Sequence, residues 1–293
     1  MKFFEKLIYT SIYSLLIKLF FAKNDAENPY LLLSDILKGG EKMFKNNAFM
    51  TEKMFVYELN DKHLSDLNKN LSYFVKHMFP TIKDDDIIKC EFVKGFQKPD
   101  VVVSVGEEKK YVSVKSFKAR LVHSEYLSTF IPFLREIGMP EDDIQFLLKW
   151  HYGDDTTDGS GIDHYDYEEL RYRYRHEIKK FNFDLLEKKD LIKKLIYRCL
   201  FKGSKLEKIE ADYIYHGTVD MGYFCTKRQI FTHIDNRKWG FMNNPHIGPL
   251  QFRAHIRGKK FEDEEKEKER HQIYLWWANL GDDIKFISER YKM

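Results

Sequence analysis

The hydrophobic pattern changes its period near residue 87, and this change constrains the fold more than any other feature. Residues 61–79 place apolar side chains at helical spacing and predict a helix that starts with Asp61 as its N-cap. The residues that follow are rich in β-branched side chains and predict three strands, Ile87 to Val93, Asp100 to Val105 and Lys110 to Phe117. The short turn at Gly106-Glu107 predicts that the second and third strands form a hairpin.

The remainder of the chain alternates helical and extended patterns. Further helices are expected near Tyr30 to Lys38, within Tyr167 to Arg198 and at Asp282 to Arg290, and further strands at Ala211 to His216, Gly222 to Thr226, Gly248 to Arg257 and His271 to Trp277. Between His123 and Gly138 the spacing is helical, but Pro132 means that the helix either starts late or is kinked there. The pattern predicts an α/β fold, a mixed sheet flanked by helices with additional helical segments.

We expect a single domain over residues 1–293. It divides into an N-terminal helical segment (1–60), a core region (61–138), and a helical insertion with further strands and a closing helix (139–293). Met1 to Phe21 is apolar at helical spacing, but Lys18 interrupts it and it is too short to span a bilayer. A packing helix is expected there, with a membrane-surface helix or a secretory signal as the alternatives.

Charge and cysteine content limit the possible ligand sites and the cellular compartment. The chain carries 49 Lys and Arg against 46 Asp and Glu, so any site for a polyanion must come from local clustering. Its three cysteines are widely separated, which excludes a disulfide framework and a four-thiolate zinc site and suits a reducing cytosol. We therefore expect a cytoplasmic protein that does not cross a membrane.

The predicted hairpin brings chemistry-bearing side chains together. Ser113 and Lys115 are two residues apart on one strand and so share a face, and the pairing can bring Asp100 near that face. A carboxylate beside an amine can bind a divalent cation such as Mg²⁺ and stabilise charge on a phosphate. Ser113 is expected to line the site rather than attack, because no base is placed to activate it.

Pro99-Asp100, a hairpin, and an element that ends in Lys115 resemble the PD-(D/E)XK nuclease superfamily, which includes type II restriction endonucleases. Ser113 stands where that family usually has an acid, as in its Ser-Val-Lys variants, which recruit a carboxylate from the following helix. Glu125 is the best candidate for that role, and His123-Ser124-Glu125 is similar to the segment after the motif in a group of putative restriction enzymes.

The resemblance implies a restriction-endonuclease-like core and a Mg²⁺-dependent endonuclease, with Mn²⁺ as a substitute, that cleaves double-stranded DNA as a homodimer. Asp100 and Glu125 would hold the metal, and Glu91 on the first strand is a second possible ligand. Lys115 would orient the water or stabilise the transition state. The competing interpretations are an ordinary hairpin with an exposed lysine, and a catalytically degenerate nucleic-acid-binding protein with the same fold.

Basic residues cluster in two places that suit a phosphate backbone. Lys118 and Arg120 follow the predicted site directly. Arg171, Arg173 and Arg175 alternate with tyrosines at the start of a stretch, residues 171–205, that has twelve Lys or Arg against four acids. A solvated basic face is the alternative interpretation of these clusters.

Other signals are weak. The loop at Asp154 to Gly159 lacks the acidic twelfth position of a calcium loop, because Tyr165 stands there. The charged run Lys259 to Arg270 is expected to be a solvated helix or loop. The histidines have no zinc-binding spacing and no glycine-rich phosphate loop is present, so no nucleotide cofactor is expected.

Overall fold

A computed structural model describes residues 47–95, 98–204, 209–240 and 242–291. Nearly all of them belong to the second of two compact units, residues 48–293. The helices predicted at Met1 to Phe21 and near Tyr30 to Lys38 lie outside the described residues. Within the described ranges, no helix has the length and apolar character that crossing a bilayer requires.

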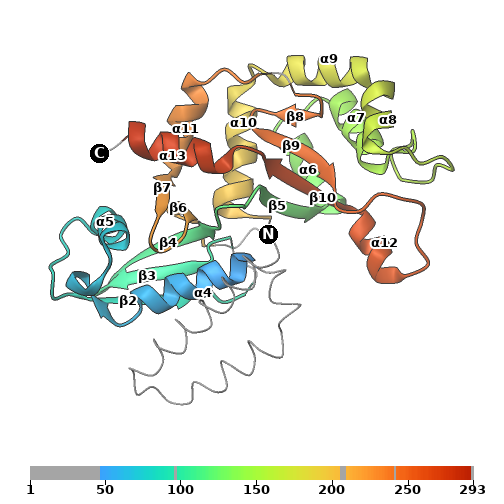
Figure 1. The fold of residues 1–293 in the computed structure, drawn as a ribbon. Coiled ribbons are helices and arrows are strands. Elements are labelled where there is room, and N and C mark those ends of the chain that lie inside the picture. The colour runs from blue at the N-terminus through green and yellow to red at the C-terminus, as the bar shows by residue number, and fades with distance from the viewer. Residues whose placement is uncertain (1–46, 96–97, 205–208, 241, 292–293) are drawn as a thin grey trace, which may run out of the picture. The chain divides into compact units, whose positions relative to one another are not determined.

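The first sheet has six strands in the order β1-β2-β3-β4-β6-β7 (Figure 1). These are β1 (Lys62–His63), β2 (Ile87–Phe92), β3 (Val101–Val105), β4 (Glu108–Lys115), β6 (Tyr213–Gly217) and β7 (Gly222–Thr226). All neighbours are antiparallel except β4 and β6, which are parallel. The mixed α/β sheet is therefore confirmed, and so is the hairpin, whose turn has Gly106 at a φ of +57°.

Helices α4 (Asn47–Leu59) and α5 (Lys69–Met78) pack against this sheet. Phe55 and Leu59 of α4 share one apolar cluster with Phe74 of α5 and with alternate residues of the strands. The Phe74 ring lies 5.1 Å from the ring of Tyr215 and 4.6 Å from that of Phe224. These contacts place α4 and α5 in one apolar cluster with the sheet.

The predicted start of a helix at Asp61 is wrong. Asp61 has a positive φ of 58° and binds Lys89, and the chain after it forms the edge strand β1 and a short 3-10 turn, η1 (Leu64–Asp66). The helix begins only at Lys69, because the side chain of Asn68 accepts a hydrogen bond from the Leu71 amide at 2.9 Å.

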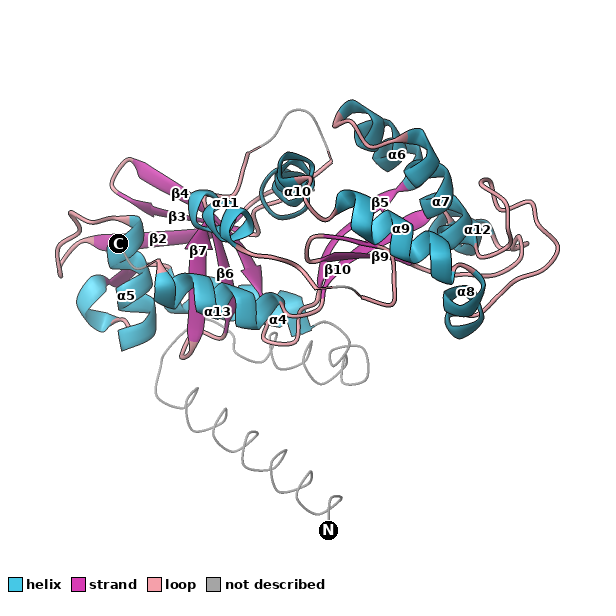
Figure 2. Ribbon diagram, turned by 90° about the horizontal axis from the view of Figure 1, so that it is seen from above, coloured by secondary structure: helices cyan, strands magenta, loops and turns pink. Residues whose placement is uncertain are grey.

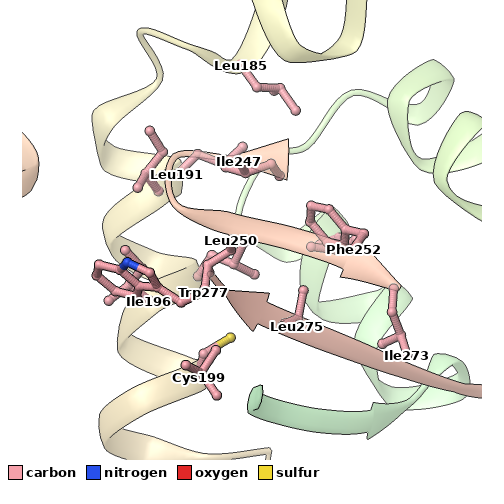
Figure 3. Packing of buried hydrophobic residues seen from close by; sticks show 14 of the residues in the cluster. Leu185, Leu191, Ile196, Cys199, Ile247, Leu250, Phe252, Ile273, Leu275 and Trp277 are labelled. Carbon is pink, nitrogen blue, oxygen red and sulfur yellow. The ribbon is translucent and has the colours of Figure 1, made fainter. Parts of the chain in front are cut away.

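The second sheet has four antiparallel strands in the order β5-β10-β9-β8. They are β5 (Leu121–Tyr126), β8 (His246–Ile247), β9 (Leu250–Ala254) and β10 (Gln272–Trp277). One face of this sheet is apolar: Phe252, Leu275 and Trp277 belong to the core, and Trp277 lies beside the helix that carries Leu191, Ile196 and Cys199 (Figure 3). That helix is α10 (Lys189–Ile196), continued by the π-helical turn η2 (Tyr197–Lys202).

In two perpendicular views, α10 runs between the two groups of strands (Figures 1 and 2). Its continuation η2 contacts both β5 and β6. The remaining helices are α6 (Leu127–Glu136), α7 (Glu141–Tyr152), α8 (Tyr167–Arg173), α9 (Arg175–Leu185), α11 (Lys227–Asn236), α12 (Glu264–Arg270) and α13 (Leu280–Arg290). The structure confirms several predictions to within a few residues: the helical stretch within Tyr167 to Arg198, the loop at Gly153 to Asp163, the later strands and the closing helix.

The segment after the hairpin was only partly predicted. Helix α6 starts at Leu127 and continues through Pro132, so a late start at the proline is wrong. The residues before it form strand β5 and not a helix, which places Glu125 on a strand.

Candidate active site

Asp100 and Lys115 meet at the ends of two adjacent strands. Asp100 directly precedes β3, Lys115 is the last residue of β4, and their side chains form an ion pair with 3.4 Å between Lys115 Nζ and Asp100 Oδ2. The Asp100 side chain is 20% exposed and the Lys115 side chain is 16% exposed. The pair is therefore partly shielded from water but still open to a small ligand.

The backbone holds Asp100 rigidly. Its amide donates to the carbonyl of Val112 at 2.9 Å and its carbonyl accepts from the Val93 amide at 3.1 Å, which fixes it between β4 and the end of β2. Its Oδ2 atom also accepts from the Val114 amide at 2.6 Å and from the buried Ser113 hydroxyl at 3.0 Å. The structure thus brings together three of the four predicted catalytic residues, Asp100, Ser113 and Lys115.

A second carboxylate, which the sequence reasoning missed, approaches this pair from helix α4. Burial raises the pKa of Glu52 to about 7, with a further increase from the negative charge of Asp100 and a partial offset from Lys115. Glu52 stands three residues before Phe55, on the face of α4 that packs against the sheet. A single acid beside an apolar helical stripe has no distinctive spacing, so only the tertiary fold reveals it.

Lys98 connects the candidate site to the second sheet. Its ammonium donates to the carbonyl of Val122 in β5 at 2.7 Å. Burial and the neighbouring charge of Lys115 lower the pKa of Lys98 to about 7, against smaller opposing effects that include Asp100. This contact links β5 of the second sheet to the residues that lead into β3 of the first.

Glu125 serves a different purpose from the one expected. Arg198 binds both of its carboxylate oxygens, Nε donating to Oε2 at 3.0 Å, and His123 Nε2 donates to Oε2 at 2.8 Å. Burial alone would raise the pKa of Glu125, but the hydrogen bonds from His123 and Arg198 outweigh it and lower the pKa to about 2. Because these partners bind both carboxylate oxygens, Glu125 links strand β5 to the turn η2.

The three predicted metal ligands do not gather. Glu91 on β2 is exposed and pairs in register with Val102, two residues along β3 from Asp100. Within the described ranges, no three His, Cys, Asp or Glu side chains form a group suited to a metal ion. A site made of Asp100, Glu125 and Glu91 together is therefore wrong.

Asp100 and Glu52 carry the type of donor atom that Mg²⁺ takes in proteins. Burial is the main cause of the raised pKa of Glu52 and the negative charge of Asp100 adds to it, so a nearby cation would favour the ionised forms of both carboxylates. Mg²⁺ needs only one or two protein carboxylates, because it keeps several waters and takes oxygens from a substrate phosphate. The donor set is small, but its chemistry matches the ion.

The predicted phosphate-contacting residues divide into two groups. Lys118 and Arg120 are exposed in the connection that leaves the candidate site toward β5. On α8 and α9, Arg175 is exposed, whereas Arg171 donates to Asn244 and Arg173 makes a two-bonded ion pair with Asp155. Of the five, Lys118 and Arg120 are therefore the best placed to act together with Asp100 and Lys115.

Comparison with known proteins adds no assignment. No protein-family model matches this chain, and no curated protein matches its sequence significantly.

Proposed function

We propose that this protein is a Mg²⁺-dependent endonuclease that hydrolyses DNA phosphodiester bonds, in the manner of a type II restriction endonuclease. The observation that carries this proposal is the Asp100–Lys115 pair at the ends of β3 and β4, whose charges both act on the Glu52 carboxylate of α4. The antiparallel meander of β2 to β4, a helix packed against it, and a further strand parallel to β4 are compatible with a restriction-endonuclease-like core.

Each residue has a distinct part in this proposal. Asp100 and Glu52 would hold Mg²⁺, and the ion, when bound, supplies electrophilic assistance to the scissile phosphate. The Lys115 ammonium stabilises the negative charge that develops on the phosphate and orients the attacking water. Lys118 and Arg120 bind the DNA backbone next to the site, and this contact positions the substrate without reading its sequence.

Incubation of the purified full-length protein with supercoiled plasmid tests the proposal. We expect cleavage with Mg²⁺ or Mn²⁺, none with EDTA, and none with Asp100→Asn, which removes one negative charge without changing the side chain's shape. Glu107→Gln is the matched control, because Glu107 is exposed in the turn at the far end of the same hairpin. Cleavage by Asp100→Asn at the wild-type rate would overturn the proposed site.

The pattern of products and the molecular mass test the finer parts of the proposal. A restriction enzyme cuts at defined sites and gives discrete fragments, whereas a smear contradicts that subclass. Cutting both strands of a symmetric site suits a homodimer, because a two-fold symmetric protein matches a two-fold symmetric sequence. Sedimentation equilibrium of the DNA-free protein at the monomer mass would remove the dimer from the proposal.

One observation favours the second candidate, a catalytically degenerate nucleic-acid-binding protein. The Ser113 hydroxyl donates to the Asp100 oxygen that also binds the Val114 amide, and so competes for the lone pairs that a metal requires. Such a protein would bind DNA with ordinary salt dependence. Titration calorimetry with Mn²⁺ would then give the same result for wild type and for Asp100→Asn, because no metal binds at Asp100.

A further inference from the structure

The β5-β10-β9 sheet has a second face, opposite the apolar one, that no described helix or strand uses as core. We call it the aromatic face and define it by nine residues, Leu121, Ser124, Tyr126, Gln251, Arg253, His255, Gln272, Tyr274 and Trp276. Strand registry places these side chains on one side, because residues directly opposite each other in a pair share a face. Tyr126 is 45% exposed and Leu121 is 38% exposed, so the edge formed by β5 is open to solvent.

Rings and basic side chains alternate on the aromatic face. The Arg253 guanidinium lies 4.4 Å from the centre of the Trp276 ring, and the His255 ring lies 4.4 Å from that of Tyr274. The nine residues include no Asp or Glu, and the nearby acid Glu269 is paired with His255 at 3.3 Å. A surface of this composition is complementary to a polyanion that carries flat rings.

Two donors on this face have no acceptor. The Trp276 Nε1 and Arg253 Nε atoms are shielded from solvent and lack a hydrogen-bond partner in the described part of the chain. An unsatisfied buried donor is unfavourable, so a ligand that brings acceptors here would stabilise the folded protein. Phosphate oxygens and the edges of nucleic-acid bases are such acceptors.

The aromatic face follows the candidate active site closely along the chain. Leu121, its first residue, follows Lys115 by six positions, and the intervening connection carries the exposed cations Lys118 and Arg120. Lys98, two residues before Asp100, donates to the backbone of the next residue, Val122. A strand whose phosphate lies at Asp100 and Lys115 can therefore continue along β5 onto this face.

We propose that the aromatic face binds the unpaired bases of a single-stranded DNA segment next to the bond to be cleaved. In duplex DNA the bases are stacked on one another and their flat faces are not accessible, whereas a single strand presents them to protein rings. This inference rests on the proposed nuclease function for its choice of partner, and it makes a single strand or a single-strand junction the preferred substrate form.

Fluorescence anisotropy in EDTA tests binding without cleavage. We expect the full-length protein to bind fluorescein-labelled oligothymidylate more tightly than the same strand annealed to oligoadenylate. Trp276→Ala should weaken single-strand binding about tenfold, as the loss of one stacking platform predicts, while Trp276→Phe should retain most of it because a ring remains. Phe183→Ala, which removes a 68% exposed ring on α9, should have no effect.

Arg253→Gln and Tyr126→Ala provide independent variants in case Trp276→Ala does not fold, which its thermal unfolding curve would reveal. Unchanged single-strand affinity in the folded variants would overturn the inference. So would tighter binding of the duplex, or a change of sedimentation mass with unchanged DNA affinity, which would identify the face as a contact between copies of the chain.

The two proposals fail separately. If plasmid and oligonucleotides stay intact while the Trp276→Ala variant loses single-strand binding, the nuclease function is wrong and the binding face stands. If Asp100→Asn abolishes cleavage while the face variants bind like wild type, the nuclease stands and the face is wrong.

Discussion

Glu52 and Asp100 come from helix α4 and from the residue before strand β3, yet their carboxylates interact: the charge of Asp100 contributes to raising the pKa of Glu52 to about 7. Burial makes the larger contribution, and Lys115 offsets the two only in part. A fold that confines two acids with one ammonium carries an electrostatic cost that a dication relieves. This relationship gives the candidate site its clearest measurable signature.

Glu52→Gln tests that signature through stability. The folded pKa of Glu52 lies above its value of 4.5 in the unfolded chain, so its ionisation destabilises the fold progressively from pH 4.5 upward until about pH 7. In EDTA, we expect the melting temperature of Glu52→Gln to rise relative to wild type between pH 5 and pH 8. Mg²⁺ should raise the melting temperature of wild type more than that of the variant.

Glu58→Gln is the control for that experiment, because it removes the same group further along α4. We expect its response to Mg²⁺ to match that of wild type. Equal stabilisation of Glu52→Gln and wild type by Mg²⁺ would remove Glu52 from the proposed metal ligands.

Lys115→Met should lower the rate of plasmid cleavage about 100- to 1,000-fold, the usual loss when one group that stabilises transition-state charge is removed. Methionine preserves much of the length of the stem, so DNA affinity should change little, whereas the melting temperature should fall because Asp100 loses its ion-pair partner. Lys109→Met serves as the control, since Lys109 is exposed on the same strand. Single-turnover rates with saturating protein separate the chemical step from binding, and a wild-type rate in Lys115→Met would contradict its role.

The hairpin could be predicted from the sequence because its cause is local. β-branched side chains favour extended backbone, and glycine at Gly106 adopts the positive φ that the turn requires. The proximity of Asp100, Ser113 and Lys115 then follows from strand pairing alone. The sequence pattern was therefore enough to predict that these three side chains lie together.

The rest of the site depends on contacts between distant parts of the chain. Glu125 and Arg198 are separated by 73 residues, and no spacing in the sequence marks them as partners. The strand that carries Glu125 was missed because β5 runs directly into α6, whose helical spacing dominates the pattern over this segment. The part of Glu52 in the site could not be predicted, because it depends on the packing of α4 against the sheet.

Ser113→Asp distinguishes an active site from a degenerate one. The new carboxylate would stand where a hydroxyl now lies 3.0 Å from Asp100 Oδ2, in a position with no solvent exposure. Two carboxylates this close cannot both ionise easily, so the metal-free variant should melt at a lower temperature than wild type. Titration calorimetry should show tighter Mn²⁺ binding by the variant.

Ser113→Ala completes the comparison. It removes the hydrogen bond to Asp100 but leaves the carboxylate free to bind a cation, so cleavage should persist if Ser113 only lines the site. Loss of cleavage in a folded Ser113→Ala protein would instead give the hydroxyl a direct part in the reaction.

The Glu125–Arg198 pair predicts a stability effect that separates a structural acid from a metal ligand. Glu125 is 3% exposed, and removing one member of a buried ion pair costs about 3–5 kcal/mol, because the partner charge remains buried. We therefore expect Glu125→Gln to lower the free energy of unfolding at pH 7 by that amount. At a temperature where the variant is still folded, cleavage per folded molecule should match wild type.

The pH dependence of this effect has a definite sign. The folded pKa of Glu125, about 2, lies below the unfolded value of 4.5, so its contribution is complete above pH 4.5 and disappears as the pH falls toward 2. The stability difference between wild type and Glu125→Gln, measured by urea unfolding, should therefore shrink between pH 4.5 and pH 2.

Glu141→Gln is the matched control for Glu125→Gln, because Glu141 makes a similar two-bonded pair with Arg135 on the surface. Exposed pairs contribute little, so this variant should unfold at nearly the wild-type urea concentration at pH 7. A Glu125→Gln protein that is as stable as Glu141→Gln but cannot cleave DNA would return Glu125 to the metal site, because the loss would then be one of chemistry and not of folding.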